Sequence, residues 1–230
     1  SECVYLHRAL ESWLNPPDFE LARRIRATLS KPDLIFGMFI SEALNTSAQY
    51  YSSEEDRVLD FSKMCLPGSE GFWGANTCKA SFENEEYRAY VADITRKAMD
   101  MGVQSFLFGQ ISFQDPSRKQ AEGILRDMRS YASKKRMKIA IGAQTNTISD
   151  RKYLDRFDYI EGGVGIDANG NVEEKPCASR YEKAGWCWAL LWNKKYSSSA
   201  DMVLLHLDWS GIAGDDMSVF AAMSREERAE

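Results

Sequence analysis

Three carboxylates and three carboxamides follow the ends of short apolar segments. The carboxylates are Glu42, Glu161 and Asp208, and the amides are Gln110, Gln144 and Asn146. Two carboxyl groups can divide general acid–base work: one stays protonated to deliver a proton to a leaving oxygen, and the other is ionised as nucleophile or base. Amides form hydrogen bonds without adding charge. The set therefore suits cleavage of a glycosidic bond, with the amides binding sugar hydroxyls.

Aromatic side chains accompany these polar groups, and the C–H faces of sugar rings stack on such side chains. Aromatic residues make up 12% of the chain, enough to line a groove. Trp209, beside Asp208, and Trp73, in the Gly-rich segment 65–78, are the predicted stacking residues. Trp13 is predicted to belong to the core.

The elements that must position these residues alternate along the chain. Continuous apolar runs predict strands buried on both faces at 33–41, 102–112, 137–145, 157–163 and 202–210. Helices are predicted at 83–101, 116–135, 149–156, 179–193 and from 216 onward. Asp115 and Pro116 have the residue types of a helix start. Strand–helix alternation predicts βαβ units around a parallel sheet.

The predicted fold class is α/β, a barrel-like (β/α) arrangement of parallel strands with outer helices. The sequence contains no Gly-rich phosphate loop of the kind found in open nucleotide-binding sheets. In a closed barrel the carboxyl ends of the strands converge. That convergence would bring Glu42, Glu161 and Asp208 to one pocket.

One domain is expected over 1–230, because no linker or repeat divides the chain. Its first part, 1–32, is predicted to be helical, with helices at 4–13 and from Pro17 or Asp18 to residue 29. The remainder, 33–230, is predicted to form the barrel.

A hairpin is expected near 163–174, inserted above the sheet. Asn169 and Gly170 have the residue types of a tight turn and lie between alternating residues.

Simpler interpretations stand beside the catalytic one. Strands must end in loops, so polar residues at their ends are common without any site. His206 shares a strand face with Asp208 because side chains alternate with a period of two. A hydrogen-bonded core histidine is the interpretation we favour for His206.

Composition bounds the partners and cofactors. The chain of 230 residues carries 29 basic and 34 acidic residues, a net charge of −5, so the basic footprint of a nucleic-acid-binding protein is absent. No apolar run reaches the roughly 20 residues of a membrane span. Two histidines and the lack of a CxxC motif argue against zinc. We predict no metal and no cofactor, and the oligomeric state stays open.

Cys65 and Cys78 bracket the Gly-rich segment and form the candidate disulfide among five cysteines. Such a bridge would stabilise the fold by about 3 kcal/mol, and buried free thiols are the alternative. The chain starts without Met, and Ser224 and Glu227 open a helix near its end as a capping box. Both ends are therefore expected to continue in a longer precursor, and a secreted or extracytoplasmic location is favoured.

With these motifs the chain resembles the (β/α)-barrel glycoside hydrolases. The motifs lie within about 33–210 and are SEAL at 41–44, FGQ at 108–110, GAQTN at 142–146, YIEGG at 159–163 and HLDWS at 206–210. The resemblance implies hydrolysis of an O-glycosidic bond in a poly- or oligosaccharide by two carboxyl groups. The chain departs from the family pattern in showing five strands instead of eight. It also lacks the Asn-Glu pair that many such barrels carry after the fourth strand.

The resemblance implies a role for each candidate residue. Glu161 is expected to be the acid/base, and Asp208 or Glu42 the nucleophile or base. The substrate-binding residues are expected to be Gln110, Gln144, Asn146, Trp209 and Trp73. Retention and inversion both stay open, because the separation of the carboxyl groups decides between them. Two alternatives remain: a non-catalytic carbohydrate-binding or assembly protein that uses the same cleft, and a barrel enzyme acting on a bond outside sugars.

Overall fold

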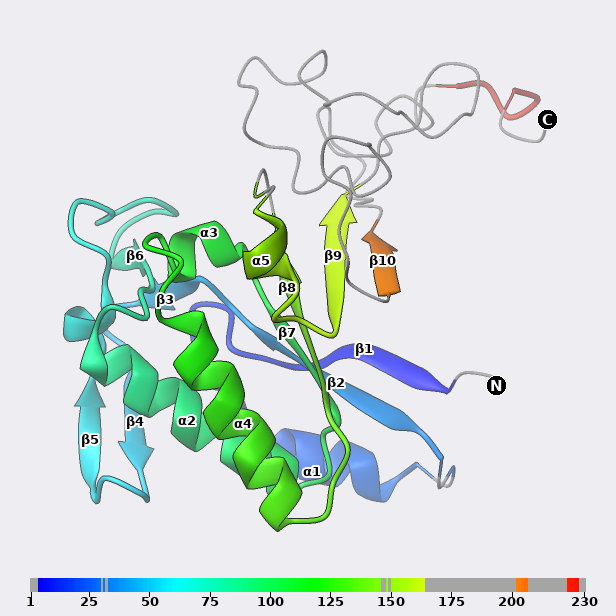
Figure 1. Cartoon of the computed structure of the whole chain (residues 1–230), viewed down its shortest axis with the longest axis horizontal. Helices are drawn as coiled ribbons and strands as arrows, with labels where there is room; N and C mark the ends of the chain where they lie inside the picture. The colour runs from blue at the N-terminus through cyan, green and yellow to red at the C-terminus, as the bar shows by residue number, and fades with distance from the viewer. Residues whose placement is uncertain are drawn as a thin grey trace. The chain divides into compact units, whose positions relative to one another are not determined.

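The structure, a computed structural model, describes residues 4–29, 31, 33–145, 148, 150–163, 202–206 and 223–227 (Figure 1). The chain divides into two compact units, 1–142 and 143–230, and each is described by itself.

A parallel sheet forms the centre of the first unit. β1 (Tyr5–Glu11), β2 (Ile35–Ile40), β7 (Ser105–Phe108) and the start of β8 (Ala140–Gln144) are neighbours in this order. β2 is parallel to both β1 and β7. The last four residues of β2 and all of β7 are buried, as expected for strands covered on both faces.

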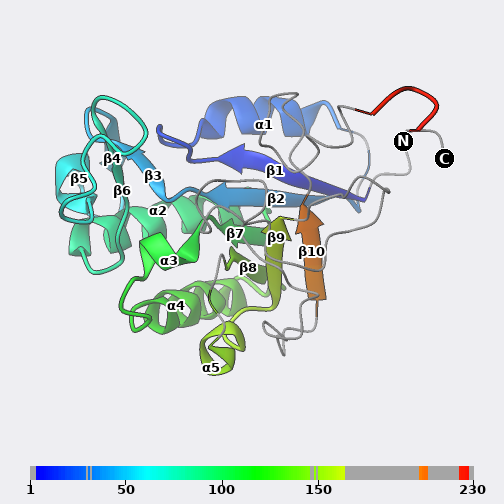
Figure 2. The ribbon, with the colours of Figure 1, turned by 90° about the horizontal axis from the view of Figure 1, so that it is seen from above.

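Helices connect the strands of the first unit. α1 (Phe19–Ala27) lies between β1 and β2, α2 (Glu85–Asp100) precedes β7, and α3 (Ile111–Gln114) and α4 (Ala121–Lys134) lie between β7 and β8. α2 and α4 pack side by side, whereas α1 lies beside β1 (Figure 2). The predicted α/β class with a parallel sheet is confirmed.

Two antiparallel strand pairs that the sequence did not predict lie between β2 and α2. β3 (Ala43–Asn45) pairs with β6 (Thr77–Lys79), and β4 (Gln49–Ser52) pairs with β5 (Arg57–Asp60). A short 3₁₀ helix, η1 (Phe61–Met64), follows β5.

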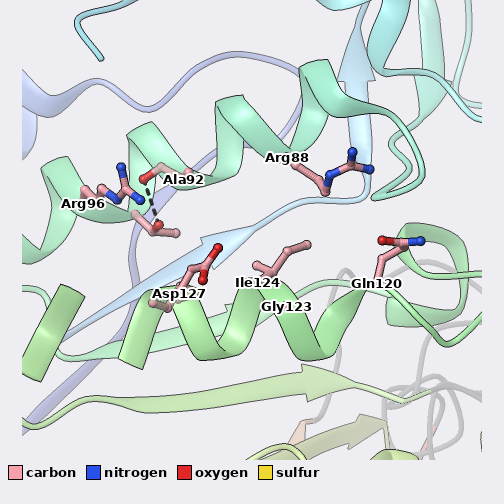
Figure 3. A pocket seen from close by; sticks show the side chains of 9 residues that line it. Arg88, Ala92, Arg96, Gln120, Gly123, Ile124 and Asp127 are labelled. Atoms are coloured by element: carbon pink, nitrogen blue, oxygen red, sulfur yellow. Dashed lines mark hydrogen bonds between the residues drawn. The ribbon is translucent and has the colours of Figure 1, made fainter. Parts of the chain in front are cut away.

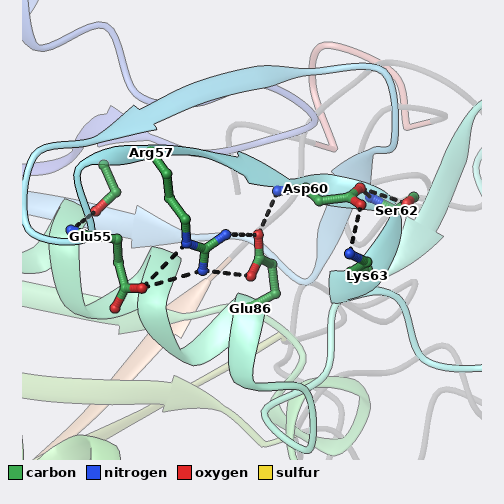
Figure 4. A network of polar contacts seen from close by, with 7 residues as sticks. Glu55, Arg57, Asp60, Ser62, Lys63 and Glu86 are labelled. Atoms are coloured by element: carbon green, nitrogen blue, oxygen red, sulfur yellow. Dashed lines mark hydrogen bonds and ion pairs between the residues drawn. The ribbon is translucent and has the colours of Figure 1, made fainter.

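An ion pair attaches the hairpin of β4 and β5 to α2 (Figure 4). Arg57 Nη1 and Nη2 contact the two carboxylate oxygens of Glu86, in the first turn of α2, at 2.7 and 2.8 Å. Glu86 Oε1 also accepts a hydrogen bond from the backbone N–H of Asp60. These bonds hold the hairpin in place beside the helix.

Neighbouring strands are also found in the second unit. The end of β8, β9 (Tyr159–Gly163) and β10 (Met202–His206) are neighbours, and β10 is parallel to β9. A short helix, α5 (Arg151–Leu154), precedes β9. The pairing of the strands within the described ranges does not close into a ring.

The predicted helix at 4–13 is wrong, because this segment contains β1. Between Leu6 and Leu10 the register against β2 shifts, which marks a bulge. Arg8 lies within it with a φ of 51°. A bulge interrupts the alternation that identifies a strand in a sequence. The following helix was predicted correctly, and Asp18 caps it by accepting a hydrogen bond from the N–H of Leu21.

The helix expected at 116–135 begins five residues later, at Ala121. Asp115 still caps this helix, although it is not adjacent to Ala121 in the sequence. Its buried carboxylate accepts hydrogen bonds from the backbone N–H groups of Lys119, Gln120 and Ala121. The residues from Pro116 to Gln120 form the turn that this carboxylate holds.

Several expectations fall outside the described residues: the hairpin near 163–174, the helix at 179–193 and the end of the strand at 202–210. Ser224 and Glu227 do exchange the two hydrogen bonds of a capping box. Among the described residues, every helix is too short or too polar to span a bilayer.

Candidate functional site

Glu42 follows β2 at its carboxyl end, where the backbone is pinned on two sides. The N–H of Ser41 donates to Ser12 Oγ after β1, and Ser41 Oγ accepts from the N–H of Ala43. The carbonyl oxygen of Glu42 accepts a hydrogen bond of 2.7 Å from the N–H of Ala80. These bonds fix the direction in which the Glu42 side chain leaves the backbone.

The carboxyl group of Glu42 is buried, with 1% of the residue exposed. Its Oε1 accepts a hydrogen bond of 2.9 Å from Nε2 of Gln110, which follows β7. Its Oε2 is also buried and makes no hydrogen bond within the described residues. Oε2 lies against Gly109, at a place that a side chain at position 109 would fill. The structure therefore brings Glu42 and Gln110 together.

Burial raises the pKa of Glu42 to about 7. The hydrogen bonds from its own backbone and from Gln110 act in the opposite direction, as do the charges of Arg8 and Lys79. Desolvation wins because the ionised carboxylate has lost its water. The group is therefore present in both protonation states near neutral pH, as general acid–base catalysis requires.

The raised pKa of Glu42 predicts a pH-dependent stability. The pKa is about 7 in the folded protein and 4.5 ordinarily, so the folded state holds the proton more tightly. This contribution is complete below pH 4.5 and is lost as the pH rises through about 7. We expect a loss of roughly 3 kcal/mol in the free energy of unfolding. Urea unfolding at pH 4.5 and pH 8 should show this loss in the wild type, and Glu42→Gln should lack it. The same pH dependence in both proteins would contradict the prediction.

Two cations lie near this carboxyl group, and both lower its pKa. Arg8, in the bulge of β1, forms an ion pair of 2.7 Å with Glu11 and stacks over the ring of Phe39 at 3.9 Å. Lys79 is in β6, opposite Ala43 of β3 in the antiparallel register. The bulge thus directs an arginine toward the site, a role that bulges often have.

Four aromatic side chains form a cluster next to Lys79, which we call the aromatic platform. Its members are Trp13, Phe72, Trp73 and Phe113, with ring centroids of contacting pairs between 4.7 and 6.4 Å apart. Trp13 is 40% exposed and Phe72 is 53% exposed. The prediction that Trp13 belongs to the core is therefore wrong, because its ring packs edge-on against Trp73 at the surface.

A disulfide joins Cys65 and Cys78 with an S–S distance of 1.97 Å, the pair that the sequence singled out. The bridge closes the loop that carries Phe72 and Trp73. Backbone bonds organise the same loop: the N–H of Trp73 donates to Thr77 Oγ1 at 3.0 Å. The bridge and these bonds limit the positions that the platform can take.

Removal of the bridge is expected to destabilise the first unit. In the loop-entropy model a closure of this length contributes about 3 kcal/mol. The double variant Cys65→Ala/Cys78→Ala should lower the free energy of unfolding by that amount in urea titrations. Wild-type protein treated with a reductant should show the same decrease, and an unchanged midpoint in both samples would contradict the prediction.

The second unit contains a similar pair. Gln144, at the end of β8, donates a hydrogen bond of 2.9 Å from Nε2 to Oε1 of Glu161 in β9. Both residues are buried. Each unit thus places a carboxyl group and an amide from neighbouring strands in contact, and sequence reasoning named all four residues.

The remaining predicted residues are placed in part. Trp73 belongs to the aromatic platform, whereas Asn146, Asp208 and Trp209 lie outside the described residues. The backbone of His206 ends β10, and its side chain is not among those described.

Sequence reasoning missed the residues that hold the two strand ends together. Gln114 is buried, and its Nε2 donates to the carbonyl oxygens of Ile40 and Gly109 at 3.1 and 2.8 Å. The hydroxyl of Tyr87 lies 2.9 Å from Gln114 Oε1 and 3.1 Å from the carbonyl oxygen of Ser41. The only signal was a second glutamine four residues after Gln110, which no pattern distinguishes from a surface residue.

A cavity of about 280 Å³ lies away from Glu42, between α2 and α4 (Figure 3). Its two arginines already have partners. Arg88 donates to the carbonyl oxygens of Phe82 and Glu83, and Arg96 pairs with Glu54. The cavity is therefore a groove between packed helices, and the candidate site stays at the strand ends.

No family model matches the chain, and no curated protein matches it. Several solved structures are similar, and they are glycoside hydrolases. A GH27 β-L-arabinopyranosidase from Geobacillus stearothermophilus is 10% identical over 62% of this chain and 33% of its own, with a TM-score of 0.40. An isomalto-dextranase from Arthrobacter globiformis is 13% identical over 75% and 33%, with a TM-score of 0.44. A family GH18 chitinase from Chromobacterium violaceum is 10% identical over 67% and 28%, with a TM-score of 0.37.

The chain spans a third or less of the length of these enzymes. At such identities none of the similarities assigns a catalytic residue.

Proposed function

We propose that the chain is a glycoside hydrolase that cleaves O-glycosidic bonds of a poly- or oligosaccharide, with Glu42 as its acid/base. The observation that carries the proposal is the buried carboxyl of Glu42, whose pKa of about 7 lies in the range a proton donor needs. Protonated, it can give its proton to the leaving oxygen, and ionised, it can take one from water. The sequence assigned this role to Glu161, and the pKa of Glu42 supports the exchange.

The second carboxyl group of the reaction has two candidates. Glu161 and Asp208 both come at or after the end of a predicted strand, and that position in the sequence is their support. Gln110, Gln144 and Asn146 are proposed to bind hydroxyl groups, and Trp73 and Trp209 to stack on sugar rings.

A (β/α) barrel is the architecture that we propose for the complete fold. Strand order supports it, because within each unit consecutive parallel strands are neighbours and the order does not reverse. Open nucleotide-binding sheets reverse their order at a switch point, whereas barrels do not. The Cys65–Cys78 bridge supports a secreted or extracytoplasmic location, where disulfides persist.

A carbohydrate-binding protein without catalysis is the second candidate. The aromatic platform supports it, because exposed rings can stack on a glycan whether or not Glu42 transfers a proton. Both candidates predict glycan binding, and only the first predicts cleavage.

A product screen separates these candidates. The protein is incubated with a panel of neutral and acidic polysaccharides between pH 4.5 and 8, and soluble products are analysed by mass spectrometry. New oligosaccharides that disappear in Glu42→Gln would support the hydrolase. Retention of a glycan without products, equal in both proteins, would support the binding protein. Neither products nor retention would contradict both.

A further inference from the structure

Lys79 is a cation that lies against two aromatic rings. Its Nζ lies 3.7 Å from the centroid of the Phe72 ring and 3.8 Å from that of Phe113. It forms no ion pair or hydrogen bond with any described residue. The two rings therefore hold the ammonium group in place, while no oxygen or nitrogen atom of the described residues accepts a hydrogen bond from it.

The backbone around Lys79 is fixed by its neighbours. Its N–H donates to Ser69 Oγ at 3.0 Å, and its carbonyl oxygen accepts from the N–H of Leu66 at 2.7 Å. Both partners belong to the disulfide-closed loop. The backbone of Lys79 is therefore fixed by this loop, and its ammonium group by the two rings. A preorganised donor loses little conformational entropy when a ligand binds.

Among the described residues, the charge that acts on Lys79 is that of the Glu42 carboxyl group. Glu42 is uncharged below its pKa of about 7. The second cation near Glu42, Arg8, is paired with Glu11 by two hydrogen bonds. Below that pKa the described residues therefore leave the charge of Lys79 unpaired beside an aromatic surface.

We propose that Lys79 is a specificity residue that selects a glycan carrying an anionic group, a carboxylate or a sulfate. The inference rests on the proposed function, because it names the substrate class of the same site. An anionic group would satisfy the ammonium by a charge-assisted hydrogen bond while the sugar ring stacks on the platform. A neutral sugar would cover the ammonium without pairing it, which is unfavourable.

The test compares glycans that differ only in charge. The pairs are polygalacturonate with its methyl ester, and dextran sulfate with dextran. Retention is measured by affinity electrophoresis for the wild type, Lys79→Met, Lys79→Arg and Lys63→Met. Methionine keeps the length and the contact with the two rings but removes the charge. Lys63 is an exposed lysine beside Asp60 and serves as the matched control.

We expect the wild type to prefer at least one charged member, with an affinity that falls as salt is added. Lys79→Met should weaken that binding by about 10- to 100-fold, the contribution of a hydrogen bond to a charged group. Binding of the neutral member should become stronger, because methionine removes the ammonium that a neutral sugar leaves unpaired. Lys79→Arg and Lys63→Met should both keep the preference. The preferred pair distinguishes a carboxylate from a sulfate.

Three results would overturn the inference, and they differ in what they leave standing. Equal retention of charged and neutral members, or equal behaviour of Lys79→Met and Lys63→Met, would remove the role of Lys79 and leave the proposed function standing. Absence of retention and cleavage for every glycan would remove both proposals together.

Discussion

Glu42→Gln is expected to lower the rate of glycan hydrolysis by about 10²- to 10⁴-fold, the usual contribution of a general acid or base. Glutamine has the shape of glutamate, and its side-chain oxygen can still accept the hydrogen bond from Gln110 Nε2. It has no proton to give to a leaving oxygen. Glycan retention should therefore stay within a few-fold of the wild type, whereas kcat should fall by the factor given above.

The leaving group distinguishes a lost proton donor from a damaged site. A glycoside with an acidic phenol as leaving group needs little protonation, so Glu42→Gln should cleave it with a much smaller loss. Glu20→Gln, at an exposed glutamate of α1, is the control and should leave both rates unchanged. An equal loss for good and poor leaving groups would contradict an acid role for Glu42.

The buried strands were predictable because their signal is redundant. β2 and β7 are continuous apolar runs, and many side chains must agree before such a run appears. β1 was predicted as a helix because its apolar pattern is short and interrupted. Its bulge at Arg8 breaks the alternation, and it lies at the end of the strand order with mostly half-buried residues. The apolar positions that remained had the spacing of a helix.

The candidate site was predictable in its residue types and not in its fine structure. Glu42 and Gln110 were expected at strand ends, and the structure places them in contact. Lys79 was not expected, since a lone lysine in a sequence usually indicates a solvated surface. It enters the site because antiparallel pairing with β3 places β6 beside Ala43, and short strand pairs that are distant in the sequence leave almost no pattern in it.

The proposal of Glu42 as the acid/base, a role that the sequence predicted for Glu161, has the same origin. Sequence spacing indicates which residues come after a strand, whereas a pKa depends on how completely each carboxyl group is desolvated. That quantity depends on long-range packing. Phe39 and Gly109 contribute to it at Glu42, and no local pattern identifies either of them.

Gly109→Ala is expected to disable Glu42 without replacing it. No positive φ requires a glycine here, so the restriction is one of space alone. A Cβ at this position would overlap Oε2 of Glu42 and lie 2.7 Å from Cζ of Phe39. The carboxyl group would have to leave its place. A displacement of about 1 Å can cost roughly 100-fold in rate, and we expect a loss of that size in kcat.

Overpacking at this position should also lower the free energy of unfolding by about 1–3 kcal/mol. Gly123→Ala in α4 is the matched control, because nothing lies within 4 Å of the added methyl group. It should raise the free energy of unfolding by about 0.5–1 kcal/mol and leave the rate unchanged. The pH dependence of stability assigned to Glu42 should shrink in Gly109→Ala, because a displaced carboxyl group regains water. Full activity in Gly109→Ala, with the wild-type pH dependence, would show that the buried position of Glu42 does not matter for the reaction.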